Sequence, residues 1–247
     1  MYIHETDSWP IFTWDRTRTD PKLAAINKAT GYLDGILSAI GFDVKDRAAV
    51  EAYTHDIVAS SEIEGLLINS DQVRSSIARR MGIKITGEVP YGHYVEGIVE
   101  MMLDAVQGYD KPLTNDRLFG WHCCLFPGGR SGYEEINVGK YRVDEMSVIF
   151  GALDREKVHY RAPSPDRVQK EMDVFLKWFN DPSTPRDYIK SAVAHFWFVS
   201  IHPFDDGNGR IGRAIADMAL SQADNSPRRY FSMSRQIGQE KNKYYDI

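Results

Sequence analysis

A short polar turn between two apolar stretches constrains the fold of this chain most. Residues 188–201 carry apolar side chains at helical spacing, and residues 202–213 then read His-Pro-Phe-Asp-Asp-Gly-Asn-Gly-Arg-Ile-Gly-Arg. Pro203 ends the first helix, because proline cannot continue the hydrogen-bonding pattern. The glycines that follow allow a tight turn before a second helix, which we expect over residues 209–222. The sequence therefore places a glycine-rich turn against the N-terminus of a helix.

The glycine-rich part of this turn has the groups that bind a polyphosphate. The backbone at Gly207 and Gly209 and the first N–H groups of the helix favour a bound anion. Arg210 and Arg213 lie three residues apart on one helical face and can clamp phosphates. Asn208 can donate and accept hydrogen bonds near the same phosphates. These residues predict a nucleotide-binding site.

Two further residues of the turn add chemistry to that site. Asp206 offers carboxylate oxygens, which are the ligands that Mg²⁺ prefers. His202 follows the first helix directly, and an imidazole there can accept a hydroxyl proton near neutral pH. Taken singly, each residue of the turn is more often structural, as a core histidine, a turn or a solvated helix face. Their combination in one turn predicts a site that holds a polyphosphate with a metal and deprotonates a hydroxyl.

Two other nucleotide-binding motifs account for the turn less well. Residues 207–212 match the G-x-G-x-x-G dinucleotide fingerprint, but that fingerprint requires a preceding strand in a βαβ unit. Here the preceding segment has the spacing of a helix, so we disfavour a dinucleotide-dependent oxidoreductase. The sequence holds no G-x-x-x-x-G-K-[ST] motif, which excludes a P-loop nucleotide-binding protein.

Composition bounds the class of protein and its partners. The chain has 247 residues, 43% of them hydrophobic, which fits one large domain or a domain with a subdomain. The net charge of −5 argues against nucleic-acid binding. The adjacent Cys123 and Cys124 are typical of reduced thiols in a cytoplasmic protein. The sequence shows neither a signal peptide nor an apolar stretch that would cross a membrane.

Most of the chain has the periodicity of helices. The spacing predicts an extended N-terminal arm over 9–15 and a mostly α fold with one small β-hairpin. Expected N-caps are Asp43, Asn69 or Ser70, and Thr114. The predicted helices cover 21–41, 43–60, 71–81, 93–106, 114–125, 165–180, 188–201, 209–222 and 232–245, and the predicted strands cover 146–150 and 158–160. The last helix is still running where the sequence stops, which suggests a truncated chain.

The turn resembles the HPFx[D/E]GNGRxxR signature of Fic-domain proteins at every defining position. Residues 139–142, which read Gly-Lys-Tyr-Arg, and the strand pair after them resemble the Fic flap. Residues 9–15 and 117–122 resemble a bacterial subgroup with an extra N-terminal helical module. The resemblance implies a Fic-type helical bundle with a hairpin flap, in which residues 1–90 form the N-terminal module and 91–247 the Fic domain.

The same resemblance implies an activity and a role for each site residue. Fic proteins commonly move AMP from ATP to a Tyr, Ser or Thr hydroxyl of a protein target. His202 would then be the general base, Asp206 the Mg²⁺ ligand, and Arg210 and Arg213 ligands of the outer phosphates, with Gly207, Asn208 and Gly209 around them. The flap would bind the target by main-chain pairing through Val148, Ile149, Phe150 and Gly151.

Residues 60–65 resemble the [S/T]xxxE[G/N] inhibitory motif of many Fic proteins, at Ser60, Glu64 and Gly65. The resemblance implies that Glu64 pairs with Arg213 and keeps it from the γ-phosphate of ATP. By itself the pattern also fits an acidic turn at a helix end. Removal of AMP from a target, transfer of another phosphate-containing group, and ATP sensing without catalysis stay open as alternatives. The sequence names no target, and since some relatives are dimeric a homodimer stays open as well.

Overall fold

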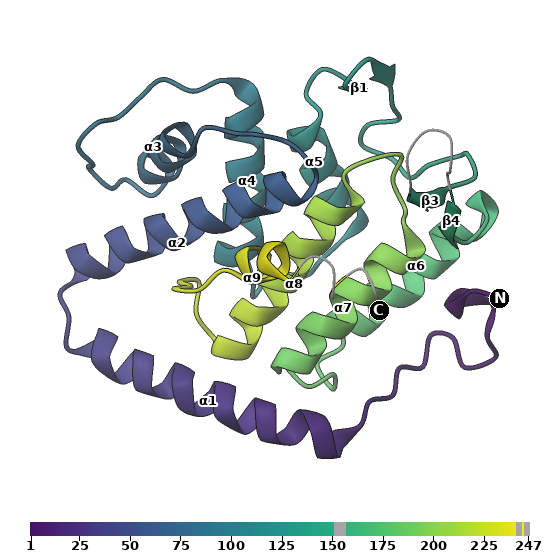
Figure 1. Ribbon diagram of the computed structural model, residues 1–247, viewed down its shortest axis with the longest axis horizontal. Helices are drawn as coiled ribbons and strands as arrows, with labels where there is room; N and C mark the ends of the chain where they lie inside the picture. The colour runs from purple at the N-terminus through teal and green to yellow at the C-terminus, as the bar shows by residue number, and fades with distance from the viewer. Residues whose placement is uncertain (151–156, 241–243, 245–247) are drawn as a thin grey trace.

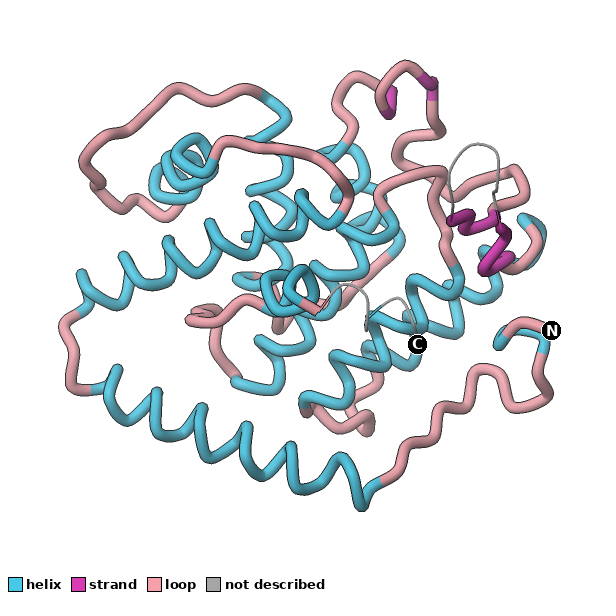
Figure 2. The backbone as a smooth tube through the Cα atoms, viewed as in Figure 1, coloured by secondary structure: helices cyan, strands magenta, loops and turns pink. Residues whose placement is uncertain are grey.

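The structure is a computed structural model that describes residues 1–150, 157–240 and 244. Helices dominate it and the few strands lie on one side, which confirms the predicted mostly α fold with a small hairpin (Figures 1 and 2). The helices are α1 (Arg16–Ser38), α2 (Phe42–Ile63), α3 (Ser70–Arg80), α4 (His93–Gln107), α5 (Asn115–Leu125), α6 (Pro165–Asn180), α7 (Tyr188–Ile201), α8 (Asn208–Asp224) and α9 (Met233–Gln239). Among the described residues, no helix combines the length and the apolar character needed to cross a membrane.

Helices α7 and α8 form the centre of the molecule and flank the turn identified in the sequence (Figure 1). Phe198, Ile201 and Ile215 of this pair are completely buried. The two helices approach closely at Gly212, where a Cβ atom would lie only 2.9 Å from the Val199 side chain. Tight packing on both sides therefore fixes where α7 ends and where α8 begins.

Helix α2 runs toward the N-terminal end of α8 and is held there by the segment around α9. The Asp56 carboxylate on α2 accepts hydrogen bonds from the Ser232 hydroxyl, at 2.5 Å, and from the Ser234 backbone N–H, at 3.0 Å. Near the other end of α2, Asp46 pairs with Arg228 at 2.8 Å. These contacts set the position of α2 and therefore of the residues at its C-terminal end.

The N-terminal residues form an arm before α1, in which residues 7–10 make a turn that was not predicted and residues 11–15 lead to the helix. Trp9 and Phe12 pack against Trp197, with ring centroids 6.1 and 5.4 Å from its ring. The Trp9 indole also donates a hydrogen bond to Glu171 of α6 at 2.8 Å. Helix α1 then follows the lower edge of the molecule in Figure 1, and none of its residues is buried. The arm therefore docks on the helical body, and α1 supplies no residue to the turn.

A small hairpin packs beside α7 near the turn. Its strands β3 (Ser147–Phe150) and β4 (Lys157–Arg161) pair antiparallel, with Val148 opposite Tyr160. The Tyr160 hydroxyl donates to the Ser200 carbonyl at 2.7 Å, which ties the hairpin to the last turn of α7. A second pair of strands, β1 (Arg130–Ser131) and β2 (Glu134–Glu135), was not predicted, because two-residue strands show no alternation in sequence.

The predicted boundaries of α1 and α2 are wrong. Helix α1 begins at Arg16, because the Asp15 carboxylate caps it by accepting the Thr17 N–H at 2.9 Å. Helix α2 begins at Phe42 with Gly41 as its N-cap, so Asp43 is not the cap. It also continues beyond the expected end, to Ile63. There Gly65 adopts a positive φ of 76° and the Leu66 N–H returns to the Ser61 carbonyl at 2.9 Å, a C-terminal capping pattern.

Candidate active site

The backbone at the end of α7 presents the His202 imidazole. His202 adopts a left-handed conformation (φ 52°, ψ 58°) as the C-cap residue of α7. Its Nδ1 lies 3.0 Å from the Val199 carbonyl, which can only accept, so Nδ1 carries the hydrogen. Burial lowers the pKa of the His202 imidazole, and the ring is neutral near pH 7. Its Nε2 therefore keeps a lone pair that can accept a proton.

Asn208 and Asp205 hold the turn itself. The Asn208 side chain accepts the Phe204 N–H at 2.9 Å and donates to the Phe204 carbonyl at 2.7 Å, and the residue is 2% exposed. Asp205 accepts both the backbone and the side-chain N–H of Asn137, at 2.8 and 2.9 Å. The Asn208 amide, which we expected beside the phosphates, is thus engaged with the main chain and fixes the turn.

Asp206 is the carboxylate of the turn that is open to a cation. It accepts hydrogen bonds from the Ser131 hydroxyl and the Gly207 N–H, and Arg210 Nη2 lies 3.5 Å from its Oδ1. No cluster of three or more His, Cys, Asp or Glu side chains that could hold a metal occurs among the described residues. A single carboxylate fits Mg²⁺, which binds nucleotides through one or two carboxylates, phosphates and water.

A buried histidine that we did not assign to the site supports Asp206 from α5. The Gly139 N–H donates to His122 Nδ1 at 3.2 Å, so His122 Nε2 carries the hydrogen and donates to the Asp206 carbonyl at 3.1 Å. The ring stacks on Phe204 with centroids 4.3 Å apart. Burial lowers the pKa of His122 to about 4, which keeps it neutral. In the sequence, His122 stood out only within the N-terminal-module resemblance.

The first turn of α8 combines close backbone approach with buried positive charge. Gly207 has a φ of 84°, a conformation that favours glycine. The Arg210 guanidinium is nearly buried, lies 4.9 Å from the centre of the Phe126 ring and donates to the Tyr94 hydroxyl at 3.3 Å. Its Nε is buried and has no hydrogen-bond partner among the residues that the structure describes. An unsatisfied cationic donor at a helix N-terminus favours an anionic ligand.

The C-terminal end of α2 reaches the same turn of α8. Arg213 Nη2 lies 2.6 Å from Glu64 Oε1, and its Nε and Nη2 donate to the Ser60 hydroxyl and carbonyl at 2.8 and 2.9 Å. A Cβ atom on Gly209 would lie 2.2 Å from Glu64 Oε1. The Glu64 carboxylate therefore occupies the space directly over the first turn of α8. Gly65, which follows Glu64, has the positive φ that ends α2 at this point.

Comparison with known proteins identifies the domain around this site. Residues 112–220 match the family model described as Fic/DOC family, and residues 2–83 match one described as domain of unknown function (DUF4172). Residues 112–220 form a Fic/DOC domain. The crystal structure of a Fic family protein from Desulfovibrio desulfuricans has the same fold, with a TM-score of 0.67 and 22% identity. The match covers 96% of this chain and 67% of that one.

Curated relatives carry the names of nucleotidyl-transferring enzymes. A protein adenylyltransferase from Nematostella vectensis is 26% identical over 73% of this chain and 40% of its own length. A probable protein adenylyltransferase from Aquifex aeolicus is 36% identical over 67% of this chain and 47% of its own length. A uridine 5'-monophosphate transferase from Xanthomonas campestris is 31% identical over 45% of this chain and 21% of its own length. The chain thus spans less than half the length of each of these relatives.

The predicted flap of the Fic domain corresponds to the β3–β4 hairpin. Val148, Ile149 and Phe150 lie on β3, while Gly151 lies outside the described residues, as do the side chains of Ile149 and Phe150. At the C-terminal end of the described chain, the Tyr244 hydroxyl lies 2.5 Å from His195 Nε2 of α7.

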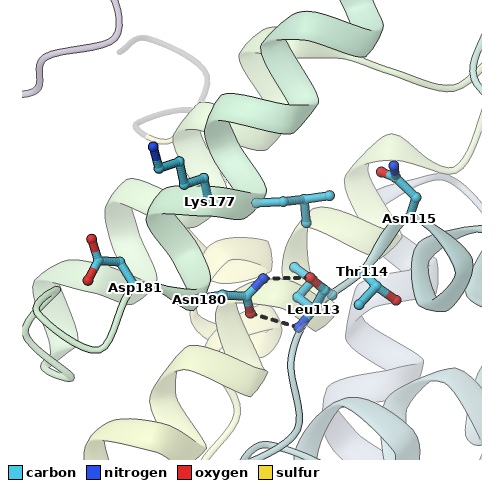
Figure 3. Close-up of a pocket in the computed structure, with 7 residues that line it drawn as sticks. Leu113, Thr114, Asn115, Lys177, Asn180 and Asp181 are labelled. Atoms are coloured by element: carbon cyan, nitrogen blue, oxygen red, sulfur yellow. Dashed lines mark hydrogen bonds between the residues drawn. The ribbon is translucent and has the colours of Figure 1, made fainter.

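A surface cavity elsewhere in the Fic domain does not overlap the turn. It measures about 540 Å³ and lies between the start of α5 and the end of α6 (Figure 3). Asn180 points toward Leu113 across it, and the two form hydrogen bonds of 2.9 and 2.7 Å. The remaining lining residues are Thr114, Asn115, Leu176, Lys177 and Asp181. The cavity contains no cluster of catalytic groups, and Asn180 acts there as a brace between segments.

Proposed function

We propose that this chain is a protein adenylyltransferase, which moves AMP from ATP to a side-chain hydroxyl of a protein target. One observation carries the proposal. His202 Nε2 has no hydrogen-bond partner among the described residues, and one short turn after His202 comes a helix N-terminus with the buried guanidiniums of Arg210 and Arg213. A base beside an anion site is what transfer from a nucleoside triphosphate to a hydroxyl requires. The names of the relatives from Nematostella and Aquifex support AMP as the transferred group.

His202 provides the acid–base chemistry of the proposed reaction. The target hydroxyl gives its proton to Nε2 while its oxygen attacks the α-phosphorus of ATP. The bond from the α-phosphorus to the oxygen that bridges to the β-phosphate breaks, and pyrophosphate leaves. The Nδ1–H bond to Val199 keeps the ring in the tautomer that can accept this proton and holds its orientation.

The turn and α8 provide the charge stabilisation. The N–H groups at the start of α8 and the guanidiniums of Arg210 and Arg213 bind the phosphates and offset their charge. Asp206 holds Mg²⁺, which neutralises phosphate charge when it is bound. The β3 strand of the flap holds the target segment by main-chain pairing, through the residues from Val148 to Phe150.

Glu64 inhibits the proposed reaction within the same chain. Its carboxylate is paired with Arg213 at 2.6 Å and lies against Gly209. A triphosphate that used Arg213 for its γ-phosphate would have to displace this carboxylate, because two anions cannot share the guanidinium without repulsion. ATP would then bind in an unproductive position while Glu64 remains in place.

Labelled nucleotides test the activity and its inhibition together. We would incubate wild type, Glu64→Gly and the Glu64→Gly, His202→Ala double variant with ATP labelled on the α-phosphate and a cell lysate as a source of targets. Label on protein in Glu64→Gly alone is the expected result. ATP labelled on the γ-phosphate is the matched control, and Glu64→Gly should add no label to that produced by the lysate alone. Absence of α-label from all three proteins, with ATP binding intact, would refute AMP transfer.

Transfer of UMP is the second candidate, because a relative from Xanthomonas campestris carries the name of a uridine 5'-monophosphate transferase. The chemistry assigned to His202, Arg210 and Arg213 is the same for either nucleotide. ATP and UTP differ only in the nucleobase, so a parallel reaction with UTP labelled on the α-phosphate separates the two candidates. Stronger labelling from UTP than from ATP would replace AMP by UMP as the transferred group.

A further inference from the structure

The backbone around His202 depends on support from outside α7. His202 is a non-glycine residue in the left-handed region, a strained conformation that persists only where neighbours enforce it. The His202 backbone N–H donates a hydrogen bond to the Phe198 carbonyl at 3.0 Å, as in the helix. The carbonyls of His202 and Pro203 have left the helical pattern and need donors from elsewhere in the chain.

Arg142 supplies both donors. Its Nε donates to the His202 carbonyl at 2.8 Å, and its backbone N–H donates to the Pro203 carbonyl at 2.9 Å. These two bonds hold consecutive peptide groups of the turn. Arg142 lies 60 residues before His202 in the chain and is 2% exposed, so solvent cannot substitute for it.

The rest of the Arg142 guanidinium binds the base of the flap hairpin. Nη1 donates to the Asp144 carbonyl at 2.7 Å, before β3, and Nη2 donates to the Pro163 carbonyl at 2.5 Å, after β4. The Ala162 N–H closes the same base by donating to the Met146 carbonyl at 3.0 Å. One side chain thus connects the turn that carries His202 to both ends of the hairpin.

Burying an arginine side chain at this position costs solvation free energy, which is offset only if the planar arrangement of its donors is used. All four of its bonds above go to neutral carbonyl oxygens, and the carboxylates that act on it, Glu145 and Asp205, form no ion pair with it among the described residues. A buried guanidinium without a paired carboxylate loses solvation that neutral acceptors restore only in part. A planar fork with several fixed donors is the property that lysine or a neutral residue cannot reproduce.

We propose that Arg142 is a positioning residue that holds His202 in its left-handed turn and sets the distance between the imidazole and the flap. This inference rests on the proposed transfer function and adds to it the residue that aligns base and target strand. A misplacement of about 1 Å between reacting groups lowers a rate by about 100-fold, which is the size of effect expected when this link is lost.

Two substitutions separate the charge of Arg142 from its geometry. Arg142→Lys keeps the charge but offers a single ammonium group in place of the fork, whereas Arg142→Met removes both. In the Glu64→Gly background, Arg142→Lys should lower the rate of transfer about 100-fold while the affinity for ATP stays unchanged. Arg186→Met is the matched control, since Arg186 is an exposed cation near the opposite end of α7 and should leave the rate unchanged.

A readout that needs no activity keeps the inference separate from the proposed function. The charged groups that act on His202 are Arg142, Glu64 and Asp206. NMR titration of the His202 ring should show the Nδ1–H tautomer in wild type and Arg142→Lys. In Arg142→Met we expect a raised pKa of His202 and a mixture of its tautomers, because the neighbouring cation and the side-chain bond to the His202 carbonyl are both gone.

These measurements decide whether Arg142 has the positioning role. Full transfer activity in Arg142→Lys, or equal losses of ATP affinity and rate, would overturn the positioning role. If Arg142→Met does not fold, Arg142→Lys decides alone. If Glu64→Gly transfers nothing, the proposed function fails, and the inference about Arg142 is then decided by the tautomer of His202. An unchanged ring signal in folded Arg142→Met would refute it.

Discussion

Replacing Glu64 by glutamine should raise the affinity for ATP and lower the stability of the free protein. The substitution keeps the size of the side chain but removes the charge that pairs with Arg213 at 2.6 Å. ATP no longer has to displace a carboxylate from the guanidinium, so its γ-phosphate binds at lower cost. In the absence of ATP, Arg213 keeps its two bonds to Ser60 but loses its ionic partner.

The size of the change in ATP affinity can be estimated from how exposed the Glu64–Arg213 ion pair is to solvent. A hydrogen bond to a charged group contributes about 1.5–3 kcal/mol. The Arg213 side chain is 3% exposed, but the Glu64 side chain is 32% exposed, so solvent screening favours the lower end of that range. About 1.5 kcal/mol corresponds to roughly tenfold tighter ATP binding. The melting temperature of the free protein should fall by a few degrees.

Calorimetric titration with ATP and with ADP, together with thermal unfolding, measures both effects. ADP lacks the γ-phosphate assigned to Arg213, so its affinity should rise less than that of ATP. Glu62→Gln is the matched control, because Glu62 is exposed two residues away and carries the same charge. Equal affinity for ATP in Glu64→Gln and wild type would refute competition between the carboxylate and the γ-phosphate.

Three further predictions concern the turn. His202→Ala in the Glu64→Gly background should abolish labelling and keep ATP binding, and a parallel loss of binding in calorimetry would contradict the role as base. Burial lowers the pKa of His122 to about 4, so the unfolded chain takes up its proton first and stability is lost as pH falls from about 6.5 toward 4. That loss is about 2 kcal/mol at pH 5, and thermal unfolding at pH 7 and 5 should show a smaller difference in His122→Gln than in wild type. Asn208→Ala removes both bonds to Phe204 and should cost about 2–4 kcal/mol in urea unfolding, so a cost below 1 kcal/mol would refute the bracing role of Asn208.

The sequence predicts the parts of this fold that depend on neighbouring residues. Helical spacing gave helices close to α3 to α8, and the Asn69 and Thr114 caps lie where their side chains can reach the next N–H groups. The boundary errors at α1 and α2 also have local causes. Asp15 and Gly41 act as caps there, although the apolar pattern becomes regular only after them.

The turn and the side chains that it carries could be predicted from the sequence alone, since His202, Asp206, Arg210 and Arg213 lie within one loop and one helical turn. Their partners were decided by the tertiary structure. Glu64 is 149 residues from Arg213 in the chain and was expected there only through the resemblance, whereas Ser131, 75 residues from Asp206, was not expected at all. The pattern of side chains along the sequence predicts helix faces and caps, which depend on residues close together in the chain. It does not predict which distant segment packs against a given face. The hydrogen bonds by which His122 and Arg142 support the turn are therefore visible only in the tertiary structure.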